Sequence, residues 1–144
     1  MDIEYLKKNQ PKDLDDAMKI LIFDIEKEDK EFLKSDDSKK IATQIHHGAG
    51  GSLRNIWYLW WNKSMAKSVL KNVPDYPQER PALVSYFNSI GIYHADDMSS
   101  IITTTLSRKL QKQDIDLDGQ VKVYKKHWED AGVDIKNDMG AEDE

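Results

Sequence analysis

The sequence predicts an all-α protein, built as one compact domain of five to seven helices around a central helix rich in glycine and tryptophan. Apolar residues recur at helical spacings of three and four along most of the 144 residues. Sustained alternation of apolar and polar residues, which marks a strand, is absent from the sequence. A chain of this length suits a single domain. We expect a polar N-terminal arm at 1–12, the helical domain at 13–132 and an acidic, disordered tail at 133–144.

The first long helix is predicted over roughly 14–27, with Asp13 as its N-cap. Its apolar face repeats at helical spacing and comprises Leu14, Ala17, Met18, Leu21 and Ile25. A highly charged segment follows, in which we predict a short helix near 29–34. A polar turn then leads to Ser38, which we expect to cap the next helix.

The stretch from His46 to Trp61 is the most unusual part of the chain. It holds two of the four histidines, three of the seven glycines and three of the four tryptophans. A continuous helix would carry one apolar stripe and, beside it, a stripe containing His46, Gly50 and Arg54. Each glycine costs such a helix about 1 kcal/mol relative to alanine, so close contact with a helix or a ligand must offset the cost. The alternative is a break near 48–51, with Ser52 capping a second helix whose N-terminus binds an anion. We favour the continuous helix.

The segment 62–71 is predicted to be helical, and three prolines make 72–81 a loop. Pro81 suits the first turn of a helix that ends at Gly91, a C′ residue.

Two further helices are expected in the C-terminal third. One begins at a cap formed by Asp96 or Asp97 and continues through the β-branched run 101–105 to Leu110. The last spans about 118–131, with Gly132 beyond its end.

Composition excludes several classes of function. The net charge is −5 and no basic cluster compensates for it, so we expect no binding to nucleic acid. No cysteine is present, which excludes disulfides and thiolate chemistry. No apolar run approaches the ~18 residues of a membrane span, and the N-terminus has no secretory pattern. We therefore expect a cytoplasmic protein that does not bind membranes.

Three segments together resemble an uncharacterised family of bacterial domains. They are residues 11–17 (PKDLDDA), 46–60 (HHGAGGSLRNIWYLW) and 94–99 (HADDMS). The resemblance spans about 11–110, with departures at Asp13, at Ala95 and in a separate Tyr76–Ser89 region. The family has no known activity, so the resemblance implies an all-helical fold and no catalytic residues. Similar small proteins occur in bacteria and phages, and the resemblance therefore suggests a host-interaction role.

Candidate ligand-binding residues gather in the central stretch. An arginine fork and a histidine could hold an anion, a glycine leaves room for it, an amide adds a hydrogen bond and an aromatic ring could stack on a base. These residues are His46, His47, Gly50, Arg54, Asn55, Trp57 and Tyr58. The structural alternative, which we favour, pairs Arg54 with Asp96 or Asp97 and leaves His46 bonded to a backbone carbonyl.

A second group of candidates comprises His94, Asp96 and Asp97. With His46 or His47 they could bind a metal or act as an acid–base pair. We favour helix capping for the aspartates, because no recognised ligand spacing is present. The segment from Asp114 to Gly119 is similar to the start of a calcium loop, but a lysine stands where its last acid would be. We assign no catalytic residue, metal site or cofactor.

These observations favour a non-enzymatic helical protein that binds a protein partner. Trp57, Trp60 and Trp61 point in different directions around a helix, so at least one should lie near the surface, where tryptophans anchor interfaces. Homo-oligomerisation is compatible with this hypothesis. The first alternative is binding of a nucleotide-like or phosphate-bearing molecule at 46–61. The second is a metal-assisted hydrolase that uses His46, His94 and Asp96 or Asp97.

Overall fold

The computed structural model describes residues 2–25, 27–45, 48–68, 72 and 75–139. The described residues form ten helices and no strand, so the predicted all-α class is confirmed and the helix count exceeds the expected range. The helices are α1 (Ile3–Lys8), α2 (Leu14–Asp24), α3 (Lys27–Leu33), α4 (Ser38–Ile45), α5 (Ala49–Ile56), α6 (Lys63–Lys67), α7 (Ala82–Ser89), α8 (Ala95–Leu110), α9 (Leu117–Asp130) and α10 (Ile135–Asp138).

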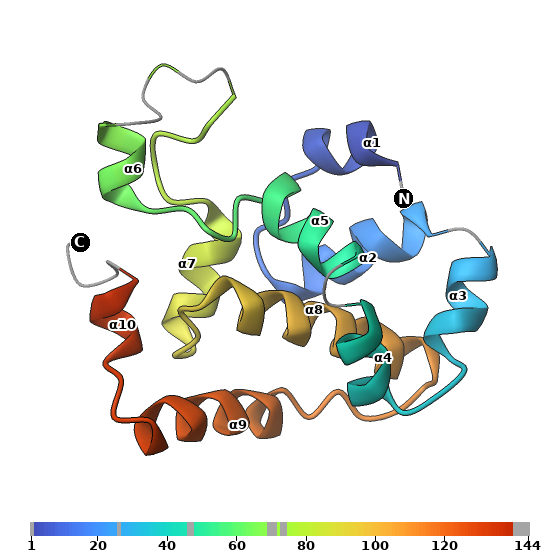
Figure 1. The fold of residues 1–144 in the computed structure, drawn as a ribbon. Coiled ribbons are helices and arrows are strands. Elements are labelled where there is room, and N and C mark those ends of the chain that lie inside the picture. The colour runs from blue at the N-terminus through green and yellow to red at the C-terminus, as the bar shows by residue number, and fades with distance from the viewer. Residues whose placement is uncertain (1, 26, 46–47, 69–71, 73–74, 140–144) are drawn as a thin grey trace.

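Helix α8 runs through the middle of the molecule, and the other long helices pack around it (Figure 1). Helices α2, α4 and α5 pack against α8, and α9 runs alongside it below α8 in the view of Figure 1. The β-branched run 101–105 is therefore helical, as predicted. Two of its three hydroxyls have partners within the buried helix: Thr103 donates to the Ser99 carbonyl over 3.0 Å, and Thr105 accepts from Gln120 over 3.2 Å.

Four helices end in the same way, with one left-handed residue and a hydrogen bond back to the last turn. The residues with positive φ are Tyr58, Gly91, Lys112 and Gly132, after α5, α7, α8 and α9 respectively. In each case the next amide donates to a carbonyl five residues earlier, at 2.9–3.0 Å. The two glycines were predicted as helix ends, and both predictions are confirmed. Tyr58 and Lys112 adopt the same conformation at a steric cost that glycine avoids.

The continuous helix predicted through the central stretch is wrong. Helix α4 ends at Ile45 and α5 begins at Ala49, while the intervening Gly48 has a non-helical ψ of −103°. The break is the alternative considered from the sequence, but Gly48 rather than Ser52 is the N-cap. Helix α5 also stops at Ile56, before the tryptophans, so the two long stripes do not exist. His46 and His47 lie outside the described residues.

Other helix boundaries differ for local reasons. Asp37 caps α4 by accepting from the amides of Lys39 and Lys40, whereas Ser38 is buried and accepts from Arg108 Nε over 2.9 Å. The N-terminal arm contains α1, whose Leu6 is fully buried in the core.

The ends of two further predicted segments also differ. Within the segment predicted as disordered tail, Asp134 caps the short helix α10. The helix expected at 62–71 is observed as α6, and 69–71 lie outside the described residues. No helix in the described part of the chain has the length and apolar character needed to cross a membrane.

Candidate functional site

Arg54 ties α5 to the first turn of α8. Its side chain is 9% exposed, and its Nε lies 3.4 Å from Asp96 Oδ1. Its Nη1 donates to Ser99 Oγ over 2.8 Å, and Ser99 Oγ donates in turn to the Asp96 carbonyl over 3.1 Å. The pairing of Arg54 with Asp96 agrees with the structural alternative that the sequence favoured, while the other part of that alternative, His46, lies outside the described residues. An anion could use this guanidinium only by displacing a carboxylate that already neutralises it.

His94 is the N-cap of α8, a role that the sequence analysis gave to Asp96 or Asp97. Its Nδ1 accepts a hydrogen bond from the Asp96 amide over 3.1 Å. The extended backbone of His94 places its ring over the free amides of the first turn, where aspartate side chains within the helix cannot reach. Because Nδ1 accepts, the neutral imidazole carries its proton on Nε2.

Four rings from three separate segments lie in one continuous contact, which we call the aromatic row: Trp60, His94, Trp128 and His127. The Trp60 and His94 ring centroids are 5.0 Å apart, edge to face. His94 stacks on Trp128 at 5.6 Å with an interplanar angle of 24°, and Trp128 meets His127 at 4.8 Å. Trp60 is 43% exposed and His127 is exposed, whereas the two middle rings are half-buried. The two end rings of the aromatic row are therefore accessible to a partner, and the two middle rings are packed against the protein.

Asp97 fixes one ring of the aromatic row, Trp128, through a hydrogen bond. Its Oδ2 accepts a hydrogen bond from Trp128 Nε1 over 2.8 Å, and the residue is 9% exposed. Burial raises the pKa of Asp97 above its ordinary value, against the opposing effects of the Trp128 hydrogen bond and the nearby His94. The carboxylate thus links the end of α9 to the start of α8.

The remaining sequence candidates lie apart from this arrangement. Trp57 is fully buried, and its Nε1 donates to the Leu6 carbonyl over 3.1 Å, so it cannot stack on a base. Gly50 is buried within α5, and Asn55 is exposed. Tyr58 is half-buried against Tyr76, with ring centroids 5.7 Å apart. The contacts above therefore join Arg54, His94, Asp96 and Asp97, while His46 and His47 lie outside the described residues.

Sequence reasoning missed the part of the site that comes from α9. Neither Trp128 nor His127 was among the candidate site residues. The spacing of apolar residues predicts that Trp128 lies on the apolar face of the last helix. It does not indicate that this face packs against the start of α8. Trp60 was recognised only as one of three tryptophans, of which at least one should be near the surface; that expectation is confirmed.

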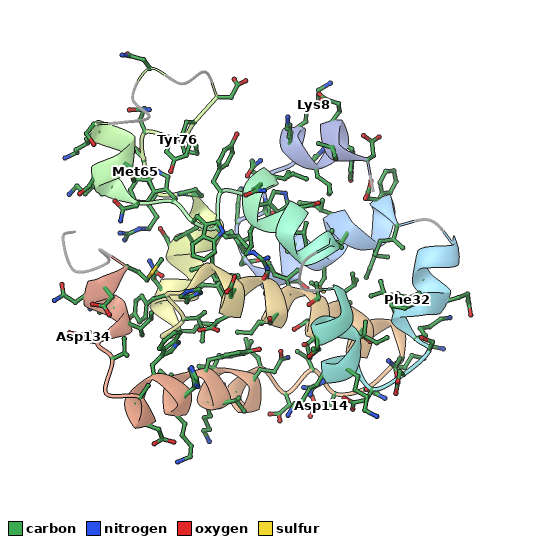
Figure 2. All side chains as sticks on the ribbon, viewed as in Figure 1. Lys8, Phe32, Met65, Tyr76, Asp114 and Asp134 are labelled. Atoms are coloured by element: carbon green, nitrogen blue, oxygen red, sulfur yellow. The ribbon has the colours of Figure 1, made fainter. Side chains whose placement is uncertain are left out.

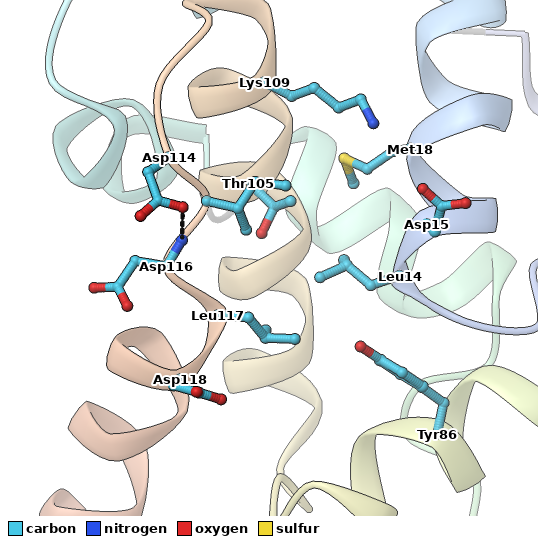
Figure 3. Close-up of a pocket in the computed structure, with 11 residues that line it drawn as sticks. Leu14, Asp15, Met18, Tyr86, Thr105, Lys109, Asp114, Asp116, Leu117 and Asp118 are labelled. Atoms are coloured by element: carbon cyan, nitrogen blue, oxygen red, sulfur yellow. Dashed lines mark hydrogen bonds between the residues drawn. The ribbon is translucent and has the colours of Figure 1, made fainter.

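Clefts open at several places on the described surface. A cleft of about 520 Å³ lies between α2, α7, α8 and the start of α9 (Figure 3). A second, of about 770 Å³, is lined by Tyr58 together with residues of α1 and the proline loop, and a third of about 230 Å³ lies between α4, α8 and α9. None of these three is lined by Arg54 or His94. Within the described ranges, no three histidine, aspartate or glutamate side chains converge as metal ligands.

Residues 10–74 match the model of a domain of unknown function, DUF6794. This match fits the resemblance to an uncharacterised family. It covers the first two of the three similar segments and ends before the third, which contains His94. No curated protein and no solved structure matches the chain.

Proposed function

We propose that this protein is a binding module that docks a protein partner on the aromatic row. The observation that supports the proposal is the unbroken contact of four rings, with Trp60 43% exposed at one end and His127 exposed at the other. Protein interfaces are enriched in such aromatic side chains, and a few of them supply most of the binding energy.

The surroundings of the row favour binding without rearrangement. The Asp97 hydrogen bond holds Trp128, and the capping bond to the Asp96 amide holds His94. Little side-chain entropy is then lost when a partner covers them, which is the main advantage of a preorganised surface.

A second aromatic contact on the described surface is a pair rather than a row: Phe23, which is 78% exposed, meets the half-buried Tyr5 at a ring-centroid distance of 5.4 Å. The exposed Phe32 and Met65 lie at opposite ends of the molecule (Figure 2). Single exposed apolar residues are ordinary on protein surfaces and need no partner to explain them.

The geometry lends less support to binding of a phosphate-bearing ligand at 46–61. Arg54 is engaged by Asp96 and Ser99, and Trp57 is inside the core. The guanidinium of Arg54 is already paired, and the Trp57 ring is not accessible for stacking on a base, so both observations oppose that alternative.

Affinity capture from the cells that encode the protein tests the proposal. The bait is the full chain in three forms: unchanged, Trp60→Ala and Phe32→Ala. Phe32 is 44% exposed, so its variant is a matched control for Trp60 at 43%. Each captured protein is then purified and titrated against the three forms.

We expect one partner whose affinity falls about 30-fold with Trp60→Ala, the loss typical of an interface hot spot, and changes little with Phe32→Ala. Equal affinity for all three forms would contradict docking on the row.

A thermal-shift screen against nucleotides, cyclic nucleotides and divalent metals tests the ligand-binding alternative. Stabilisation by a nucleotide that Arg54→Gln removes would replace the proposal with the ligand-binding alternative.

A further inference from the structure

The cleft between α4, α8 and α9 is separate from the aromatic row and is lined mainly by uncharged polar side chains. Helices α4 and α9 both pack on α8 (Figure 1). Each of the three helices contributes two polar residues that lie four positions apart and so share one face of the helix. They are Lys39 and Thr43 of α4, Ser100 and Thr104 of α8, and Gln120 and Tyr124 of α9. The volume of about 230 Å³ is several times the ~30 Å³ that one water molecule occupies in the liquid, so the cleft can hold a small organic molecule.

Gln120 presents a hydrogen-bond acceptor that no other described residue uses. The residue is 6% exposed, and its Nε2 donates to Thr105 Oγ1 over 3.2 Å and to the Ile115 carbonyl over 3.0 Å. These two bonds use both amide protons and fix the orientation of the amide, so Oε1 faces away from them and can only accept. Within the described ranges, the side-chain atoms that are both sealed from solvent and unpartnered are Asp24 Oδ2 and Asn88 Oδ1. Gln120 Oε1 is therefore open to a molecule in the cleft.

Thr104 presents a second unpartnered oxygen, from α8. It is 4% exposed, and its hydroxyl, unlike those of Thr103 and Thr105, forms no hydrogen bond with a described residue. This oxygen is not sealed from solvent either, so it can donate to or accept from a molecule in the cleft that it lines. Two side chains that are more than nine-tenths buried thus each offer an unused polar atom at the same place.

The rest of the lining carries little charge. Lys39 is the one charged side chain that lines the cleft in the described part of the chain, and it is exposed. Burial raises the pKa of Tyr124, against the opposing effect of a hydrogen bond with Ser100, so the phenol is neutral at physiological pH and can donate or accept. Ala42 and Val123 add small apolar contacts.

We propose that this cleft binds a small neutral polyol, a molecule whose adjacent hydroxyl groups each donate and accept hydrogen bonds. One hydroxyl donates to Gln120 Oε1, and its neighbours pair with the Thr104 and Tyr124 hydroxyls. An apolar ligand would leave the oxygens of Gln120 and Thr104 without partners, which opposes its binding. A carboxylate would meet the acceptor oxygen of Gln120, and an organic cation would meet the ammonium of Lys39.

Glycerol, erythritol and myo-inositol are the probes, with butan-1-ol and butanoate as controls that share the carbon chain of erythritol. Titration is followed by amide chemical shifts of the full chain at pH 7. We expect erythritol to cause saturable shifts at residues 100, 104, 120 and 124, with a Kd of about 10 mM that does not change as salt is added. Butan-1-ol should bind at least about tenfold more weakly, because its single hydroxyl cannot pair with both free oxygens. Butanoate should cause no saturable shifts at these amides.

Three variants test the polar groups separately. Thr104→Val replaces the free hydroxyl with a methyl group and should weaken erythritol binding about fivefold or more. Thr103→Val is the matched control, because Thr103 is 3% exposed on the same helix and its hydroxyl is already bonded to the Ser99 carbonyl, so erythritol affinity should not change. Thr104→Val should also leave the melting temperature unchanged or raised, whereas Thr103→Val should lower it. Lys39→Gln should not affect binding of a neutral ligand. Dispersed amide spectra of each variant show that it is folded.

The proposal is overturned by any of four results. The first is that none of the three polyols causes saturable shifts at these amides, which would mean that the cleft holds water only. The second is that butan-1-ol binds as tightly as erythritol. The third is that Thr103→Val weakens binding as much as Thr104→Val. The fourth is that butanoate binds more tightly than erythritol and loses this affinity in Lys39→Gln. None of these results bears on the aromatic row, so this proposal and the protein-binding proposal fail independently.

Discussion

The Trp128 indole nitrogen donates a hydrogen bond to the buried Asp97 carboxylate over 2.8 Å, and this bond joins the end of α9 to the first turn of α8. It fixes the orientation of the ring that stacks on His94. The geometry of the aromatic row therefore depends on a residue that contributes no ring to it.

Two substitutions of Asp97 should separate the effect of its hydrogen bond on stability from the effect of its buried charge. Asp97→Ala removes the acceptor and leaves the half-buried indole N–H without a partner, so we expect a loss of about 1–2 kcal/mol in the free energy of unfolding. Asp97→Asn keeps an oxygen acceptor and removes an ionisable group from a buried position, and should be neutral or stabilising at pH 7. Chemical denaturation of both variants measures the difference.

The pH dependence of the Asp97→Asn effect follows from the direction of the pKa shift. Burial raises the pKa of Asp97 in the folded state, so ionisation of this group destabilises the fold. Its contribution to stability is full below the unfolded-state pKa of about 3.9 and is lost as pH rises through the folded-state value. The stability gained by Asp97→Asn should accordingly be largest near neutral pH and shrink on acidification. A gain that grows as the pH falls would show that the shift has the opposite sign.

Trp57→Phe tests how the N-terminal helix is held. The Trp57 Nε1 hydrogen bond to the Leu6 carbonyl connects the end of α5 to α1, and Trp57 is fully buried. The phenylalanine fills less volume and leaves a buried carbonyl without this partner, so we expect a loss of about 2–3 kcal/mol. Hydrogen exchange should rise first in α1. Unchanged protection of the α1 amides would mean that the apolar contacts of Leu6 alone hold the helix.

Lys112→Gly should stabilise the protein. Lys112 is exposed with φ +58° after α8, a conformation that glycine adopts without steric cost, so the gain should be about 1 kcal/mol. Lys122→Gly is the matched control, because it makes the same change at an exposed position inside α9 and should cost about 1 kcal/mol. The two melting temperatures should move in opposite directions. If both fall, the conformation at Lys112 is not strained.

Gly50→Leu should destabilise the fold, since Gly50 is buried in α5 and a four-carbon side chain overpacks its surroundings by about 1–3 kcal/mol. Gly51→Ala, at the neighbouring half-buried position, adds one carbon and should change stability much less. Thermal unfolding compares them. A silent Gly50→Leu would show that nothing packs closely against this glycine.

The parts of the fold that could be predicted are those that local chemistry determines. The spacing of Leu14, Met18 and Leu21 gave the position of α2, and the glycines at 91 and 132 marked two helix ends that the structure confirms. The α8 helix was predicted correctly, despite its β-branched run, because the charged residues around it favour helix.

The predictions were wrong where the structure depends on the conformational cost of particular backbone positions or on contacts between distant segments. The spacing across Gly48–Gly51 fitted a continuous helix, but the conformational cost of glycine favours the observed break. Tyr58 ends α5 with a positive φ that no residue preference indicates. In the site, the pairing of Arg54 with Asp96 was anticipated because a buried guanidinium needs a carboxylate. The approach of Trp128 to His94 depends on how α9 packs on α8, which the sequence does not encode locally.

Site-specific photo-crosslinking tests the protein-binding proposal most directly. A photo-crosslinking amino acid is placed at position 60, at the exposed end of the row, and in a second form at position 32, which is equally exposed on α3. Irradiation in the cells that encode the protein should join position 60 to one defined protein and leave position 32 without that product. The same product from both positions, or none from position 60 when the variant is folded and abundant, would contradict docking on the aromatic row.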